Sequence, residues 1–233
     1  MAMKRAEARQ MIEICRNKNV NLMVGQMVRL SPLILRMKEK IRSGIIGKVE
    51  FIKAEYMYDA RLSQRRWMLD RKTAGGGATF DIGVHSLDTI RSLLDDDVVS
   101  VKSQLAPRPT EAATEQTSIL ALKFSQGIQA SIYSSFVTSF RRSILEIIGQ
   151  EGVLYAENFT SSNMTIPLKI QLGKKGAIAE VQEEQIIIPN LYEKEVTLFS
   201  DSILYNTLPP VPGEEGLKNQ LVLDEAMNGI SDQ

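Results

Sequence analysis

Apolar residues recur every three or four positions in several stretches of the chain, which is the spacing of one face of an α-helix. This spacing predicts helices over residues 4–18, 82–94, 193–203 and 214–230. A further helix is predicted to begin at Ser31-Pro32, because serine caps a helix N-terminus and proline fits the first turn, and to end at Gly44.

Apolar and polar residues alternate in other stretches, and this two-residue period is typical of β-strands with one buried face. It predicts strands at residues 48–58, 98–105, 116–124, 127–136, 142–149, 152–157, 163–172 and 179–188. The turns at Ser125–Gly127 and Gly149–Gly152 have hairpin composition and favour antiparallel pairing. Residues 59–72 are charged and predict an irregular loop. The fold class is therefore α+β, with a largely antiparallel sheet covered on one face by helices.

The amino-acid composition argues against a nucleic-acid-binding protein and against a membrane protein. Lysine plus arginine and aspartate plus glutamate both total 28, so no basic excess favours nucleic acid as a partner. Cys15 is the only cysteine, which excludes an internal disulfide and fits a reducing, cytoplasmic setting. No stretch approaches the roughly 18 apolar residues of a membrane span, and the N-terminus lacks the pattern of a secretory signal. We expect a soluble protein without a membrane partner.

The segment from Gly75 to Asp88 concentrates the candidate chemistry. It places the only histidine, His85, behind three consecutive glycines and predicts Asp81 as the N-cap of the following helix. Asp81 and His85 are one helical turn apart, so a carboxylate could orient an imidazole that exchanges protons with a hydroxyl group. The alternative interpretation is a structural helix, in which Asp81 only caps and His85 makes a local hydrogen bond.

Other sites are weaker in the sequence. The triple glycine lacks the preceding strand and the G-x-G-x-x-G spacing of a dinucleotide site. We predict no metal ligands, because one histidine without a second histidine or cysteine makes a poor zinc site; a carboxylate-rich magnesium site is the alternative. Arg29 and the charged cluster around Trp67 could line a pocket for a hydroxylated or anionic ligand, although Trp67 could equally anchor the core.

Several motifs in order resemble the C-terminal part of the glucose-fructose oxidoreductase and inositol dehydrogenase family, Gfo/Idh/MocA. The resemblance covers nearly the whole chain. It rests on Glu7 to Gly25, Arg29-Leu30-Ser31-Pro32, Gly44 to Val49, the pattern Gly75-Gly76-Gly77 with Asp81, Gly83 and His85, the turn Gly149–Gly152, and Pro212 to Gly216.

The resemblance implies an NAD(P)-dependent oxidoreductase that acts on a sugar, inositol or related polyol. It implies that His85 is the acid/base for a substrate hydroxyl and that Asp81 orients or polarises it. It also implies that Arg29 lies near the substrate, and we predict Trp67 as a second substrate contact. A non-catalytic relative that binds a ligand or a partner is the alternative.

The family's glycine fingerprint and Glu-Lys-Pro motif are missing from this sequence. We therefore expect residues 1–28 to be the last helix and strand of a Rossmann domain and residues 29–233 to be a substrate-binding and oligomerisation domain. NAD or NADP is expected in the parent protein, with no cofactor bound tightly by this chain alone, because pyrophosphate binding needs the glycine turn. The resemblance further implies a homo-oligomer that associates through the sheet.

Overall fold

The computed structural model describes residues 1–174 and 176–228. Its longer helices are α1 (Arg5–Asn17), α2 (Pro32–Arg42), α4 (Val84–Leu94), α5 (Leu191–Leu204) and α6 (Gly213–Asn228), with short helices at η1 (Met27–Leu30), η2 (Ala60–Leu62), η3 (Arg66–Leu69), α3 (Arg71–Ala74) and η4 (Thr79–Gly83). Its strands are β1 (Val49–Asp59), β2 (Val98–Ala106), β3 (Thr117–Phe124), β4 (Gln129–Ser135), β5 (Val137–Gly149), β6 (Gly152–Glu157), β7 (Met164–Lys174) and β8 (Ala177–Ile188).

The strands form one eight-stranded sheet in the order β2-β3-β4-β1-β5-β6-β7-β8. Strands β1 and β4 are parallel, and the other neighbouring pairs are antiparallel. Both predicted hairpins are present, since β3 pairs with β4 and β5 pairs with β6. Strand β1 lies between β4 and β5 in this sheet. The candidate site lies at the C-terminal end of β1.

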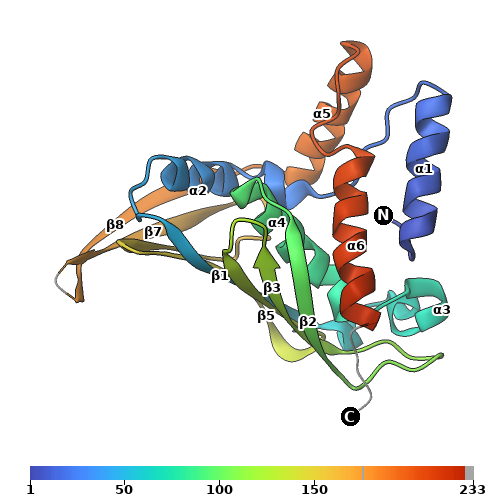
Figure 1. Ribbon diagram of the computed structural model, residues 1–233, viewed down its shortest axis with the longest axis horizontal. Helices are drawn as coiled ribbons and strands as arrows, with labels where there is room; N and C mark the ends of the chain where they lie inside the picture. The colour runs from blue at the N-terminus through green and yellow to red at the C-terminus, as the bar shows by residue number, and fades with distance from the viewer. Residues whose placement is uncertain (175, 229–233) are drawn as a thin grey trace.

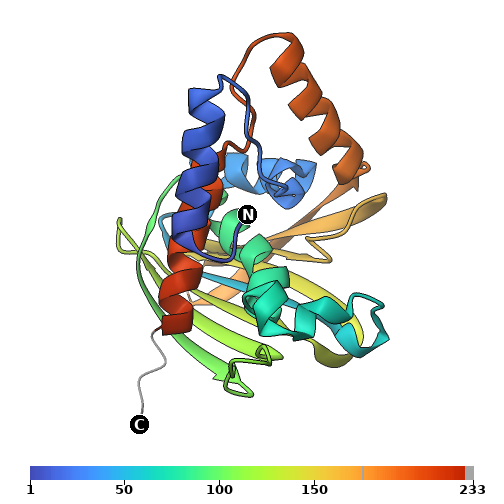
Figure 2. The same ribbon diagram turned by 90° about the vertical axis from the view of Figure 1, so that its right-hand side faces the viewer.

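The helices lie on one face of the sheet, as Figures 1 and 2 show from two directions. Between the layers, Leu87 and Ile90 of α4 are fully buried against sheet residues such as Ile52 and Leu145. The apolar stripe predicted for the helix after the triple glycine therefore does face the core. This packing fixes α4, and with it His85, against the sheet.

The α+β prediction is confirmed, and most predicted elements coincide with observed ones within a few residues. The apolar run Val20–Gly25 differs, because it forms only an isolated bridge between Met23 and Pro212 rather than a strand. A strand needs a partner along its whole length, and the described chain supplies one at a single residue. Residues 59–72 are more ordered than predicted and contain η2, η3 and the start of α3. The last two residues of the helix predicted over 214–230 lie outside the described residues.

No helix in residues 1–174 and 176–228 covers the opposite face of the sheet. Strand β3 shows the alternation clearly, because Leu120 and Leu122 are buried while Ile119 and Lys123 are exposed. No helix in the described part of the chain has the length and apolar character needed to cross a membrane.

Candidate functional site

The triple glycine makes a close approach between two backbone segments. A Cβ atom on Gly77 would lie 1.8 Å from the backbone oxygen of Glu115, so no other residue fits here without movement of the backbone. The fully buried Glu115 carboxylate accepts hydrogen bonds from the backbone N–H groups of Gly77 and Thr79, at 2.9 and 3.0 Å. Glu115, which precedes β3, thus caps the segment that carries Asp81 and His85.

Asp81 lies in η4, a π-helical turn that continues directly into α4. The prediction that Asp81 is the helix N-cap is wrong, because the chain is already helical at this position. The Asp81 carboxylate instead accepts a hydrogen bond of 2.9 Å from the Tyr58 hydroxyl and pairs with Arg65 at 3.4 Å. Burial and the neighbouring Asp81 charge raise the pKa of Tyr58, so its hydroxyl keeps the proton that it donates.

His85 lies in the first turn of α4 and is partly buried. Its Nδ1 atom lies 2.9 Å from Oε1 of Gln26, a residue that is 5% exposed. An amide oxygen only accepts, so Nδ1 carries the proton of the neutral imidazole and Nε2 keeps its lone pair. Burial lowers the pKa of His85 and outweighs the opposing charges of Asp88 and Asp81, so the ring is neutral at pH 7.

The expected hydrogen bond between Asp81 and His85 does not form. Their spacing of four residues would align them on an α-helix, but the π-helical turn at Thr79–Gly83 changes the rotation per residue between them. Gln26, from the segment before η1, takes the position of the orienting partner instead. Asp81 and His85 nevertheless line the same two cavities.

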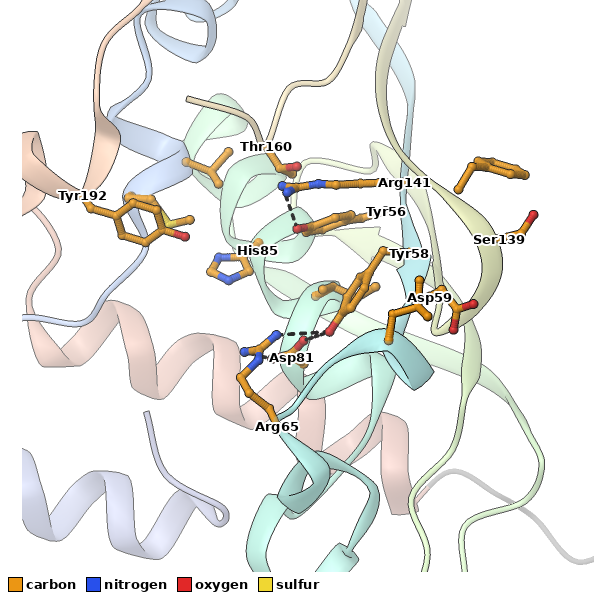
Figure 3. Close-up of a pocket in the computed structure, with 15 residues that line it drawn as sticks. Tyr56, Tyr58, Asp59, Arg65, Asp81, His85, Ser139, Arg141, Thr160 and Tyr192 are labelled. Carbon is orange, nitrogen blue, oxygen red and sulfur yellow. Dashed lines mark hydrogen bonds and ion pairs between the residues drawn. The ribbon is translucent and has the colours of Figure 1, made fainter. Parts of the chain in front are cut away.

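The first cavity, here called the tyrosine pocket, has a volume of about 500 Å³ and appears in Figure 3. Side chains with hydroxyl, carboxylate, guanidinium and imidazole groups converge on it, most of them from β1, η4, α4, β5 and the start of α5. These are Tyr56, Tyr58, Asp59, Arg65, Asp81, His85, Ser139, Arg141, Thr160 and Tyr192. Such a lining suits a ligand that carries several hydroxyl groups.

The second cavity, here called the methionine pocket, is also lined by His85 and has a volume of about 510 Å³. Trp67 lines it with its side chain about half exposed, so this residue is not a core anchor. The other lining residues are largely apolar: Met1, Ala2, Met3, Met11, Leu22, Met23, Val24, Met68, Ala74, Phe80 and Val84 among them. His85 therefore borders one polar and one apolar cavity.

Arg29 lies outside the lining of both cavities. Its guanidinium makes two hydrogen bonds with the buried Asp88 carboxylate, at 2.6 and 2.7 Å, and a third with Glu215 at 3.2 Å. Asn219 also donates to Asp88. The structure thus gives Arg29 a buried ion pair between η1, α4 and α6 and places its side chain outside the lining of both cavities.

Three of the residues that shape the site were missed by sequence reasoning. Gln26 lies 59 positions from His85, and Glu115 lies 36 positions from Thr79, so local spacing carried no signal for either. Arg141 is one of two adjacent arginines in β5, and only the strand's alternation could have shown that one of them faces a pocket. Within residues 1–174 and 176–228, no group of three or more histidine, cysteine or acidic side chains is arranged to hold a metal ion.

Residues 34–155, which include β1 to β5, the start of β6 and both Asp81 and His85, match the sequence profile described as the GFO/IDH/MocA C-terminal domain. The chain belongs to the GFO/IDH/MocA family.

Curated GFO/IDH/MocA relatives extend the match to most of the chain. D-xylose 1-dehydrogenase [NADP(+)] of Haloarcula marismortui is 28% identical over 90% of this chain and 58% of its own length. 1,5-Anhydro-D-fructose reductase of Ensifer adhaerens is 26% identical over 93% of this chain and 64% of its own length. The chain therefore spans less than two thirds of these relatives.

A solved GFO/IDH/MocA-like structure supports the same architecture. The aldose-aldose oxidoreductase from Caulobacter crescentus, in complex with glycerol, superposes with a TM-score of 0.84 and 25% identity, covering 98% of this chain and 67% of that one. The fold is therefore shared along nearly the full length of this chain.

Proposed function

We propose that this chain is the substrate-binding part of an NAD(P)-dependent oxidoreductase that acts on a sugar, inositol or related polyol. The observation that carries the proposal is the position of His85, whose neutral ring is held by Gln26 and borders both a polar and an apolar cavity. The relatives named as a sugar dehydrogenase and a sugar reductase support this substrate class.

In this proposal His85 handles the proton of the reacting hydroxyl. Its unprotonated Nε2 accepts that proton when an alcohol is oxidised to a carbonyl compound, and the imidazolium returns it in the reverse direction. The lowered pKa of His85 keeps the base form available at neutral pH. The ring need not turn during the reaction, because Gln26 holds Nδ1 throughout.

Asp81 is proposed to orient the substrate together with Tyr58 and Arg65. The carboxylate is already bound by both side chains, at 2.9 and 3.4 Å, and its place in the wall of the tyrosine pocket lets it accept a further hydrogen bond from a substrate hydroxyl. Trp67 is proposed to face the cofactor side, because it lines the methionine pocket rather than the tyrosine pocket. Arg29 is proposed to hold α4 in place through Asp88.

The methionine pocket fits the nicotinamide end of a cofactor. Its apolar wall of Val84, Phe80 and Met68 adjoins His85, and a flat heteroaromatic ring could lie against it. A nicotinamide bound there would supply hydride transfer, with NADP favoured by the name of the xylose dehydrogenase relative. The glycine fingerprint that binds the pyrophosphate is not in this sequence, so we expect tight binding only in a protein that includes a Rossmann domain.

The test is turnover of a panel of sugars and polyols with NAD and NADP by the protein joined to its cofactor-binding domain. His85→Ala should lower kcat by about 10²- to 10⁴-fold, the usual contribution of general acid–base catalysis. Glu225→Ala, at an exposed position of α6 outside the lining of both cavities, is the control and should leave kcat unchanged. Unaffected turnover in His85→Ala would overturn the acid/base role, and sugar binding without turnover in the wild type would favour a non-catalytic relative.

We also propose that the chain self-associates through the uncovered sheet face. Ile119 on this face is 47% exposed and pairs across the ladder with Tyr133, an arrangement of apolar and polar groups that suits a protein interface. Ile119→Lys should shift the sedimentation coefficient toward that of a monomer. A wild-type chain that sediments as a monomer at all concentrations would contradict the proposal.

A further inference from the structure

The acidic side chains of the tyrosine pocket all have cationic partners. Asp81 pairs with Arg65 at 3.4 Å, and Asp59 makes two hydrogen bonds of 2.8 Å with Arg61, which lies outside the pocket lining. His85 is neutral at pH 7 because burial lowers its pKa. These groups together leave no unbalanced negative charge in the pocket.

Arg141 is a second arginine in the pocket lining, in addition to Arg65, which pairs with Asp81. It projects from β5 into the pocket, where Nη2 donates to the Tyr56 hydroxyl at 3.1 Å and Cζ lies 5.6 Å from the centre of the Tyr56 ring. No carboxylate pairs with it among the described residues. Figure 3 shows its guanidinium pointing toward Thr160 and Tyr56, with His85 beyond them.

The contact with Tyr56 fixes the guanidinium and leaves most of its hydrogen-bonding capacity unused. A guanidinium has five N–H donors in a planar fork, and one of them is engaged here. The cation–π contact stabilises the charge without neutralising it. A planar fork that is held in place and faces a pocket is suited to a carboxylate or phosphate group.

We propose that Arg141 forms a subsite for an anionic substituent of the substrate, so that the preferred ligand is a sugar or polyol bearing a carboxylate or phosphate group. The hydroxyl groups of Ser139, Thr160 and Tyr192 line the same cavity and fit the neutral part of such a ligand. This inference rests on the proposed function only in placing the substrate in the tyrosine pocket.

The single histidine makes the test direct. With ¹⁵N-labelled histidine, every imidazole resonance of the 233-residue chain comes from His85, which lines the tyrosine pocket, and the Arg141 variants show whether a shift arises there. The chain is titrated separately with glucuronate, glucose 6-phosphate, glucose and inorganic phosphate. We expect saturable shifts with one or both anionic sugars and at least about tenfold weaker binding of glucose, as for loss of a charge-assisted hydrogen bond. The two anionic sugars distinguish a carboxylate site from a phosphate site.

Arg141→Gln should weaken binding of the anionic sugar at least about tenfold and leave glucose unaffected. Arg141→Glu should abolish anionic binding and serves as the second variant. The matched control is Arg142→Gln, the next residue of the same strand, which pairs with Glu157 and does not line the pocket. Equal binding of glucose and glucuronate, an equal response to inorganic phosphate alone, or full affinity in Arg141→Gln would overturn the proposal.

These outcomes are separable from the proposed activity. Binding that depends on Arg141 without any turnover in the joined protein would leave the anionic subsite intact and remove the oxidoreductase proposal. Turnover of neutral sugars that depends on His85 but not on Arg141 would support the oxidoreductase proposal and remove the anionic subsite.

Discussion

The two sides of the candidate site are held in different ways. On the inner side, the buried Glu115 fixes the backbone, the buried Gln26 fixes the imidazole, and the buried Asp88 binds Arg29, all by hydrogen bonds. On the outer wall, Arg65, Arg141 and Tyr192 are exposed, and the two arginines are held by hydrogen bonds to Asp81, Tyr58 and Tyr56 at the surface. The proton-handling group is therefore positioned by buried hydrogen bonds, whereas the ligand-contacting arginines are positioned by hydrogen bonds that solvent can reach.

The two sides should differ most in their contribution to stability, which is measured by removing one carboxylate from each side. Asp88→Asn removes the more deeply buried of the two carboxylates that pair with Arg29, since the side chains of Asp88 and Arg29 are 1% and 10% exposed, and leaves Glu215 at 3.2 Å. We expect the free energy of unfolding in urea to fall by about 3 kcal/mol, the lower end for breaking a buried ion pair, because Glu215 still faces the guanidinium.

The matched substitution on the outer wall is Asp59→Asn, because its partner Arg61 is 66% exposed although the Asp59 side chain is only 11% exposed. Water can solvate Arg61 after the substitution, so the free energy of unfolding should fall by at most about 1 kcal/mol. A mild effect of Asp88→Asn, equal to that of Asp59→Asn, would show that burial does not distinguish the two sides.

Gly77→Ala tests the backbone contact beneath Asp81 and His85. The added Cβ collides with the backbone oxygen of Glu115, so the segment must shift, with an expected loss of about 1–3 kcal/mol in the free energy of unfolding. Gly173→Ala is the control, because its Cβ would lie at an ordinary 3.5 Å from the nearest atom. Equal thermal midpoints for the two variants would contradict the close approach.

The pH dependence of stability tests the neutral state of His85. Its pKa in the folded chain is lowered below the ordinary value of 6.5, so the unfolded chain binds the proton more readily. The contribution to stability is full above pH 6.5 and falls as the pH drops toward the folded pKa, by at most about 1.4 kcal/mol per pH unit. His85→Gln should lack this component in urea denaturation measured at several pH values. A folded-state pKa at or above 6.5 in an NMR titration of the single histidine would contradict it.

Gln26→Leu should have the smallest effect on stability and the clearest effect on the imidazole. Loss of the Oε1 acceptor removes the preference for a proton on Nδ1, so the ¹⁵N shifts of the two ring nitrogens should move toward each other. Gln26→Glu should raise the pKa of His85, because a carboxylate stabilises the imidazolium. Gln129→Leu, exposed on β4, is the control and should leave both nitrogens unchanged. A wild-type spectrum with the proton on Nε2 would show that the amide of Gln26 donates instead.

The helices and strands could be predicted because each depends on a repeat along the chain. Leu87 and Ile90 lie on the buried stripe expected of them, and the turn at Gly149–Gly152 joins two antiparallel strands. The same local reasoning gave the wrong helical position for Asp81. A π-helical turn of five residues is too short to show a repeat of its own, and its residue types do not differ from those of an α-helix, so the sequence does not reveal it. For that reason the expected hydrogen bond between the Asp81 carboxylate and the His85 ring does not form.

The sequence by itself determined the α+β class, the position of the helix that carries His85, and the choice of Asp81 and His85 as the residues of interest. The tertiary structure alone decided which partners they have: Gln26 for His85, Tyr58 and Arg65 for Asp81, and Asp88 for Arg29. Periodicity reports contacts between residues a few positions apart, whereas these partners are 16 to 59 positions distant and meet only when the helices pack on the sheet.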